Sequence, residues 1–287
     1  MKKYSFLFLM LCTLYLQNTI AQSKIDSIQL NREYYNLADA LQKPGNVFRL
    51  NLSNQNLSVA DSVWLKFPNL QYLSLKNDHL KEIPSGIGSL KKLRTLDLSG
   101  NDFRVLPATL SNLTDLRELY INDDPYFELN KSMPVISQFT NLEFLSLKND
   151  HIDQIPTDFG KLNKLRKLDL SGNDFKILPS AFSNLKSLQE LYLNDEKYLQ
   201  LNDNIYVLSQ LPSLKSLHLE NDGLKEIPKS IGKLKNLESL YLNNNEFRSL
   251  PKEIEGMKNL KFLDFHDNKL TLPQGMENQF LGIKIVF

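Results

Sequence analysis

The sequence predicts an α/β solenoid, in which short parallel strands form a curved concave sheet and irregular or short helical segments form the convex side. Two observations predict it. One apolar pattern recurs ten times, and successive copies start 23 or 26 residues apart. In addition, 41% of the 287 residues are hydrophobic, which excludes a disordered chain and is enough for a long, continuous core.

The repeated pattern is clearest in two segments, LRTLDLSGNDF from Leu93 to Phe103 and LRKLDLSGNDF from Leu165 to Phe175. Both follow L-x-x-L-x-L-x-x-N-x-L/F. A longer period of 72 residues, three repeats, indicates that a block of three was duplicated. The ten copies begin at Val47, Leu70, Leu93, Leu116, Leu142, Leu165, Leu188, Leu214, Leu237 and Leu260.

Each repeat predicts one strand and one return segment. In x-x-L-x-L-x-x, alternate side chains point to opposite faces, so the two leucines point inward and their neighbours outward. The inward leucines of successive repeats stack into one core. A proline at a fixed place in the second half, such as Pro84 or Pro107, lacks the N–H that a central strand needs. The second half is therefore expected to return along the convex side.

These units resemble leucine-rich repeats of the class that carries L-P-x-x-I-x-x-L in its second half. One example is Ile83-Pro84 with Ile87 and Leu90. The resemblance covers about residues 47–272, and the chain is similar to bacterial secreted and Ras-group leucine-rich-repeat proteins. The resemblance implies a leucine-rich-repeat solenoid that serves as a binding scaffold.

The ninth position of each repeat holds an asparagine in the family, where it bonds to the backbone of the turn. A carboxylate there accepts hydrogen bonds but donates none. We expect the neighbouring Asn77, Asn149 and Asn221 to take over the role, and the alternative is that the turn donors are shared differently. The aspartates lack the dense D-x-D spacing of calcium loops, which argues against a calcium ladder. The ninth residues are Gln55, Asp78, Asn101, Asp124, Asp150, Asn173, Glu196, Asp222, Asn245 and Asn268.

Residues 1–21 are typical of a secretory signal peptide. Lys2 and Lys3 precede an apolar run from Phe6 to Leu16, and small residues follow at a cleavage site. The apolar run is too short to span a bilayer as a stable anchor. We therefore expect the mature chain to begin at Gln22 and to be exported to the periplasm, the cell surface or the medium. An uncleaved membrane anchor is the alternative.

Both ends of the solenoid, residues 47–272, need caps that cover the outermost core layers. Residues 22–46 are expected to form the N-terminal cap, with a capping helix over residues 31–42. Residues 273–287 are expected to form the C-terminal cap, in which residues 281–287 alternate like a strand.

The sequence predicts no catalytic, cofactor or metal site. It contains no zinc-protease, nucleophile-elbow or P-loop motif. His79 and His151 lie three repeats apart, and His218 and His266 lie two apart. At about 4.8 Å per strand, neither pair can share a zinc ion. We therefore expect a non-enzymatic protein without cofactors.

The charge is almost balanced, with 34 basic and 33 acidic residues and a formal net charge of +1. This balance predicts no polyanion-binding face, and so disfavours nucleic acid and anionic membranes as partners.

Large aromatic side chains occupy several outward positions of the predicted strands. On a rigid sheet, exposed aromatic residues are typical anchors of a protein interface. The alternative is that the rings stack on each other only to stiffen the sheet. The candidate ligand-binding residues are Tyr72, Tyr120, Phe144, Tyr192, His218, Tyr241 and Phe262.

We therefore expect a protein partner, held mainly on the concave face. A carbohydrate ligand, or a passive role as an envelope spacer or adhesin, is the alternative. A second candidate surface is a lateral ridge formed by the two 26-residue repeats, which start at Leu116 and Leu188 and expose Tyr126 and Tyr198.

Overall fold

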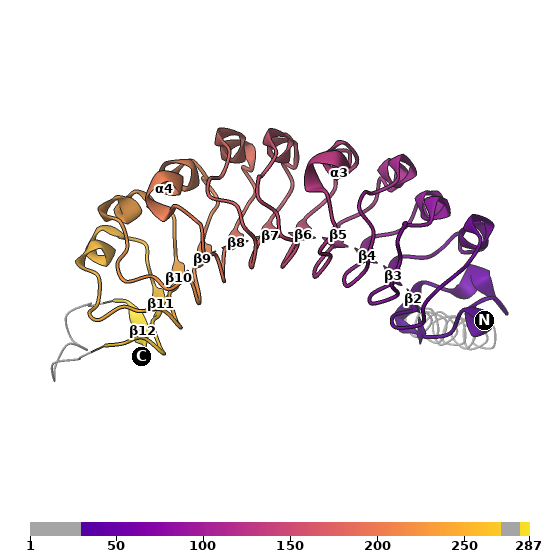
Figure 1. Ribbon diagram of the computed structural model, residues 1–287, viewed down its shortest axis with the longest axis horizontal. Helices are drawn as coiled ribbons and strands as arrows, with labels where there is room; N and C mark the ends of the chain where they lie inside the picture. The colour runs from indigo at the N-terminus through magenta and orange to yellow at the C-terminus, as the bar shows by residue number, and fades with distance from the viewer. Residues whose placement is uncertain (1–29, 271–281) are drawn as a thin grey trace, which may run out of the picture.

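A computed structural model describes residues 30–270 and 282–287, and shows one curved sheet of twelve parallel strands with short helices along its convex side (Figure 1). The strands follow one another in chain order, so each coil contacts its neighbours. The predicted solenoid is confirmed. The strands are β1 (Glu33–Tyr34), β2 (Arg49–Asn51), β3 (Tyr72–Ser74), β4 (Thr95–Asp97), β5 (Glu118–Tyr120), β6 (Phe144–Ser146), β7 (Lys167–Asp169), β8 (Glu190–Tyr192), β9 (Ser216–His218), β10 (Ser239–Tyr241), β11 (Phe262–Asp264) and β12 (Lys284–Val286).

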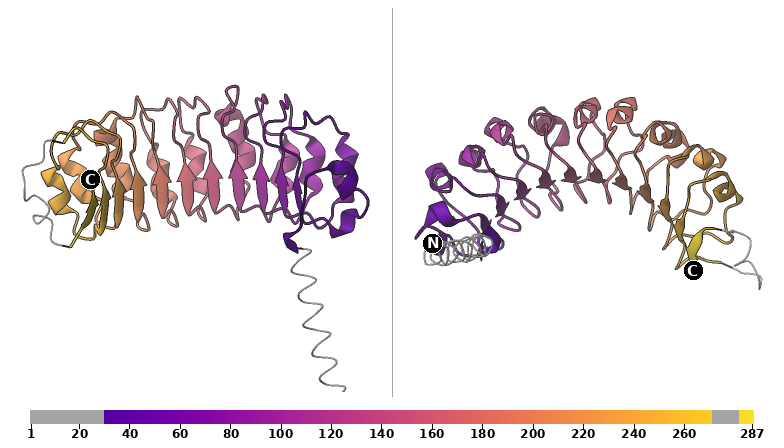
Figure 2. Two further views of the ribbon diagram at one scale, coloured as in Figure 1. Left: turned by 90° about the horizontal axis from the view of Figure 1, so that it is seen from below. Right: turned by 180° about the vertical axis from the view of Figure 1, so that it is seen from behind.

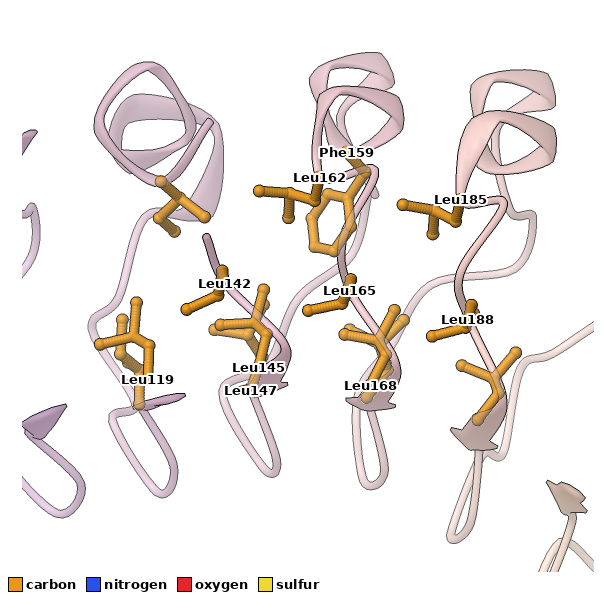
Figure 3. Packing of buried hydrophobic residues seen from close by; sticks show 14 of the residues in the cluster. Leu119, Leu142, Leu145, Leu147, Phe159, Leu162, Leu165, Leu168, Leu185 and Leu188 are labelled. Carbon is orange, nitrogen blue, oxygen red and sulfur yellow. The ribbon is translucent and has the colours of Figure 1, made fainter. Parts of the chain in front are cut away.

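The core is a stack of leucines that runs from coil to coil between the sheet and the convex side. The central leucines of successive strands pair in register, as Leu119, Leu145 and Leu168 do, and none of the three is exposed. Figure 3 shows these side chains side by side in a row, with a second row of leucines, Leu142, Leu165 and Leu188, between them and the convex helices. Burying one leucine stabilises the fold by about 2 kcal/mol. The repeated stack is therefore the main source of stability.

The convex side consists of short helices, most of which begin directly after the proline of the L-P pair. η3 follows Pro84 and η4 follows Pro107, where the fixed φ of proline suits the entry to a helix. Helices need about 8–10 Å between axes, whereas strands lie about 4.8 Å apart, so the stack bends into an arc. The 3₁₀ helices are η1 (Pro44–Asn46), η2 (Asp61–Lys66), η3 (Ser85–Ser89), η4 (Ala108–Asn112), η5 (Thr157–Lys161), η6 (Ser180–Asn184), η7 (Lys229–Lys233) and η8 (Lys252–Gly256).

The two 26-residue repeats carry α-helices in place of 3₁₀ helices. α3 spans Leu129–Ile136 and α4 spans Leu201–Ser209, and both lie on the convex side (Figure 1). The three extra residues of each repeat therefore lengthen the convex segment, as the spacing predicts.

The N-terminal cap differs from the predicted helix over residues 31–42. Glu33–Tyr34 form β1, which pairs in parallel with β2, and this strand separates the helical Asn31 from α2 (Leu37–Ala40). The side chain of Asn36 begins this helix by accepting the N–H groups of Ala38 and Asp39. The length of the predicted helix was wrong because β2 would otherwise leave an unpaired sheet edge, which β1 satisfies. The predicted signal peptide, and residues 22–29 of the cap, lie outside the described residues.

At the C-terminal end, β12 pairs in parallel with β11. The strand predicted within residues 281–287 is therefore confirmed, whereas residues 273–281 of the predicted cap lie outside the described part. Within residues 30–270 and 282–287, no helix has the length and apolar character needed to cross a membrane.

The ninth residues form a buried ladder along the edge where the strands end. Asn101 Nδ2 donates to the carbonyl oxygens of Leu98 at 2.6 Å and Leu75 at 2.9 Å. Its Oδ1 accepts the backbone N–H groups of Asp78 at 3.1 Å and Leu80 at 3.0 Å. One asparagine thus ties the turn of its own coil to that of the preceding coil.

Carboxyl groups take the same place in five coils, at Asp78, Asp124, Asp150, Glu196 and Asp222. One oxygen of each accepts the N–H of the preceding ladder residue, at 2.6–3.1 Å. The second oxygen is buried and has no partner within the described residues. Burial raises the pKa of Asp124 and Asp222 to about 8, and the pKa of Asp150 and Glu196 to about 9. These four groups therefore hold their protons at neutral pH, but unlike the asparagine amide their second oxygen donates to no partner within the described residues.

The neighbouring asparagines do not replace the missing amides. Asn77, Asn149 and Asn221 have φ values of 57°, 59° and 60°, and this left-handed backbone turns their side chains outward. They donate to the residue at the same repeat position of the preceding coil. Asn77 donates to Asn54 Oδ1 at 3.1 Å, and Asn149 donates to Asp123 Oδ1 at 2.8 Å. The expectation that they take over the role was wrong.

Candidate functional site

All seven candidate residues occupy outward positions of the strands. These strands form the concave face of the solenoid (Figure 2). The structure divides them into three groups. Tyr72 lies on β3, Tyr120 and Phe144 on β5 and β6, and Tyr192, His218, Tyr241 and Phe262 on β8 to β11.

Tyr192, His218, Tyr241 and Phe262 form one aromatic stack. The first three occupy the same register position of adjacent strands. Their ring centroids lie 3.9 Å and 4.0 Å apart, with interplanar angles of 15° and 7°. Phe262 lies diagonally across from Tyr241, at 5.3 Å and 50°. Stacking uses the ring faces, so the tyrosines present mainly their edges to the concave side.

His218 is the buried centre of this stack. It is only 7% exposed, between the rings of Tyr192 and Tyr241. Its Nε2 lies 3.5 Å from Glu190 Oε1, and its Nδ1 lies 3.5 Å from Glu220 Oε2. Its burial makes His218 a positioning residue for the two tyrosines rather than a surface contact.

Tyr120 and Phe144 form a separate edge-to-face pair, with centroids 4.9 Å apart and an interplanar angle of 73°. Lys167, on the strand between this pair and the stack, joins the two. Its Nζ lies 5.6 Å from the centroid of the Phe144 ring and 4.6 Å from that of Tyr192, and donates to the Tyr192 hydroxyl at 2.9 Å. The aromatic surface is therefore continuous from β5 to β11.

Hydroxyl groups along this surface are held by acidic neighbours. The hydroxyl of Tyr192 donates to Glu190, and that of Tyr120 lies 3.4 Å from Glu118 Oε2. Burial and the nearby Glu118 carboxylate raise the pKa of Tyr120 to about 12, so this tyrosine stays neutral. The surface thus combines fixed rings with fixed polar groups.

Tyr72 stands apart from both groups. The guanidinium of Arg49 lies 4.0 Å from its ring centroid, and the same arginine pairs with Glu33 at 3.1 Å. The ring thereby joins the cap strand β1 to the first full repeats. A cation over an aromatic face is a stabilising contact in its own right.

The lateral ridge is more exposed than the concave face but holds fewer contacts. Tyr126 is 53% exposed and Tyr198 51%, and Arg104 lies 5.9 Å from the ring centroid of Tyr126. Asp124 and Glu196, which precede these tyrosines by two residues, are buried ladder residues and contribute nothing to the surface of the ridge.

A group of three or more potential metal ligands (His, Cys, Asp or Glu) does not occur among the residues that the structure describes. The arrangement of the concave face suits contact with a partner through rings, edges and fixed polar groups.

A family model described as a leucine-rich repeat region matches residues 47–131, 123–215 and 200–279. The chain belongs to the leucine-rich repeat family. No curated protein sequence matches it significantly.

Solved structures of leucine-rich repeats share the fold. An internalin from Listeria monocytogenes is 21% identical, with a TM-score of 0.56 over 83% of this chain and 72% of the internalin. Toll in the Toll–Spatzle complex of Drosophila is 20% identical, with a TM-score of 0.63 over 82% of this chain and 35% of that chain. The TLR13–ssRNA13 complex gives 23% identity and a TM-score of 0.64, over 84% and 44% of the two chains.

Sequence reasoning missed the part that Lys167 plays in this leucine-rich repeat surface. The lysine occupies an outward position, and its neighbours in the adjacent repeats include Phe144 and Tyr192. A lysine at an outward position, with an aromatic residue at an outward position of the strand on each side, is the signal that could have identified it.

Proposed function

We propose that this leucine-rich repeat chain is a non-enzymatic binding scaffold that acts outside the cytoplasm and holds a protein partner on its concave face. The observation that carries the proposal is the continuous aromatic surface from Tyr120 to Phe262. Its rings are fixed by stacking and by Lys167, so little conformational entropy is lost on binding.

Export is supported by the leader pattern in residues 1–21, with its basic start, apolar run and small-residue end. Sequencing the N-terminus of the native protein tests it. We expect Gln22, and a native chain that begins at Met1 would contradict export with cleavage.

A protein partner is favoured over a carbohydrate by the geometry of the rings. Sugar rings pack against open aromatic faces, whereas the faces of Tyr192, His218 and Tyr241 cover one another. The exposed edges and the fixed carboxylates suit a partner that offers both apolar and polar groups. The Toll–Spatzle complex, in which a protein of the same fold binds a protein, supports this choice.

The experiment begins with the mature chain as bait in native envelope fractions and culture medium, followed by affinity measurements on the captured partner. One variant changes Tyr192, Tyr241 and Phe262 to alanine, and the other changes Tyr126 and Tyr198 to alanine. A central aromatic anchor contributes about 2 kcal/mol or more. We therefore expect the triple variant to lose detectable binding and the ridge variant to keep it.

Both variants must retain the circular dichroism spectrum and cooperative melting of the wild type. Loss of affinity in the ridge variant alone would place the partner on the lateral ridge and contradict the concave site. If neither variant changes the affinity, the partner binds on neither surface and both site assignments are contradicted.

A further inference from the structure

The balanced net charge conceals a concentration of positive charge along one long edge of the solenoid. One edge consists of the segments that lead from the convex helices into the strands. Four positions per repeat face this edge. Counted from the first leucine of the repeat, they are the residues four, two and one before it and the residue directly after it. In the repeat that starts at Leu165 they are Lys161, Asn163, Lys164 and Arg166. In the nine repeats from Leu70 to Leu260, these positions carry fourteen Lys or Arg and three Asp or Glu. We name this surface the basic edge.

The opposite edge, where the strands end, has no such excess of positive charge. The seventh to twelfth positions of the same nine repeats carry thirteen Asp or Glu and nine Lys or Arg. Four of these acids are the buried ladder carboxyls that hold their protons at neutral pH, so this edge is close to neutral. The net charge of the whole chain does not reveal this concentration, because it sums over every surface of the molecule.

All fourteen cations of the basic edge are exposed, and most have no compensating carboxylate. Glu143 pairs with Arg117 at 3.3 Å and with Arg166 at 4.0 Å. Glu238 pairs with Lys215 and Lys261 in the same way. Lys161 pairs with Asp158 of its own helix. The other nine cations form no ion pair within the described residues. Six of these nine are Lys91, Lys92, Lys164, Lys186, Lys235 and Lys258.

The shape of this edge favours a flat partner. The coils end at nearly one level along it when the sheet is viewed from its concave side (Figure 2). A cavity beside Lys235 and Asn236 has a volume of about 10 Å³, which is too small for a sugar or a base. The cations also occupy four different positions of the repeat, so they form a two-dimensional array rather than a single line along the solenoid.

The composition of the edge argues against single-stranded nucleic acid. Such ligands bind where bases stack on exposed aromatic rings. The exposed tyrosines of the described residues, Tyr35, Tyr126, Tyr198 and Tyr206, lie away from these four positions. A two-dimensional array of cations without rings fits a planar array of anions.

We infer that the basic edge docks the solenoid sideways on an anionic lipid surface, through the headgroups and without insertion. This orientation leaves the concave face, the site of the proposed function, open to the side and free to hold its own partner. The association depends on charge alone, so salt weakens it strongly.

The test is co-sedimentation of the mature chain with phosphatidylcholine vesicles that contain either no or about one third phosphatidylglycerol, a fraction that gives a strong negative surface potential. We expect binding to the anionic vesicles at low salt, weak binding to neutral ones, and release by salt. The edge variant changes Lys164, Lys186, Lys235 and Lys258 to glutamate. Its matched control changes Lys76, Lys81, Lys176 and Lys197, unpaired lysines of the opposite edge, to glutamate.

Each lysine near an anionic surface strengthens binding about fivefold. The edge variant should therefore bind the anionic vesicles at least about a hundredfold more weakly than the wild type. The control variant keeps the basic edge, and so should keep most of its affinity for the vesicles. Equal losses in both variants would overturn the inference, as would equal binding to neutral vesicles. Binding to dextran sulfate or single-stranded DNA without binding to anionic vesicles would assign the edge to a linear polyanion instead. Loss of vesicle binding leaves the affinity for the concave-face partner unchanged, so the two proposals fail separately.

Discussion

Asp124 and Asp150 occupy the ninth position of adjacent repeats, and Asp150 Oδ1 accepts the backbone N–H of Asp124 at 3.0 Å. Each keeps a second, buried carboxyl oxygen without a partner within the described residues. Glu196 and Asp222 repeat the arrangement three coils later, with a distance of 2.7 Å between the Glu196 nitrogen and Asp222 Oδ1. The boundary between three-repeat blocks thus carries a pair of carboxyls where an asparagine would supply a donor.

These pairs predict that the protein becomes less stable as the pH rises. Unfolded carboxyls titrate near pH 4, whereas burial raises the pKa of the four groups to about 8 or about 9. The folded state therefore binds more protons between these limits. The stability that these protons contribute is fully present below about pH 4 and is lost as the pH rises through about 8 to 9. Thermal melts at pH 6 to 10 should show a falling melting temperature, and a constant one would contradict the protonated ladder.

Replacing one of these acids with its amide should stabilise the protein at alkaline pH. Asp150→Asn supplies a donor without a charge at any pH, as Asn101 does in its own coil. We expect a gain of about 1–2 kcal/mol in the free energy of unfolding at pH 8, and a shallower dependence on pH. Urea unfolding at pH 6 and pH 8 measures both. Asp153→Asn, an exposed change in the same coil, is the matched control and should leave the pH dependence as it is.

The sequence predicts the path of this chain well because the fold repeats one local rule. The spacing of leucines sets the strands, and the prolines set the start of the convex helices. The short cap helix and the carboxyl ladder escape such reasoning, since both depend on what the neighbouring coil offers: an open edge beside β2 and an unpaired N–H at each turn. On the concave face, the outward positions of Tyr192 and Tyr241 follow from the pattern, but the burial of His218 between them does not.

Substitution of Gly100, which lies in a turn, should also lower the stability of the protein. Its φ is +70°, and a methyl group there would overlap Asn77 Oδ1 of the preceding coil. Gly223 has a similar φ of +65° but nothing within 4 Å. Gly223→Ala should therefore cost about 1 kcal/mol for the backbone alone, and Gly100→Ala about 1–3 kcal/mol more. Chemical unfolding of the two variants separates these costs. Adding Asn77→Gly to Gly100→Ala should recover the difference, and no recovery would show that the clash is elsewhere.

His218 should matter for the order of the concave face rather than for direct contact. His218→Ala removes the middle ring of the stack and two aromatic pairs, each contributing about 0.5–1.5 kcal/mol. His218→Phe keeps a ring of similar size between Tyr192 and Tyr241. We expect the alanine variant to melt at a lower temperature and to bind the partner more weakly, and the phenylalanine variant to restore both. Weak binding by a stable His218→Phe variant would instead indicate that the imidazole contacts the partner.

The N-terminal cap should protect the first coils of the solenoid. β1 covers the edge of β2, and Glu33 holds Arg49 and Asn51 at 3.1 Å and 3.0 Å. Deleting residues 22–42 of the mature chain exposes the first core layer, in which Leu50 and Leu52 are fully buried.

At about 2 kcal/mol for each leucine returned to water, the first coils of the truncated protein should fray or associate with another copy. Hydrogen exchange should then be faster from β2 to about β4 and unchanged beyond β6, because a solenoid is held together by contacts between neighbouring coils. Light scattering reports association directly. The point variant Glu33→Gln, which keeps β1 but weakens its ion pair with Arg49, serves as the control and should cost no more than about 1 kcal/mol. A truncated chain that stays monomeric, melts as the full mature chain does and exchanges at the same rate would show that β1 and α2 do not act as the cap.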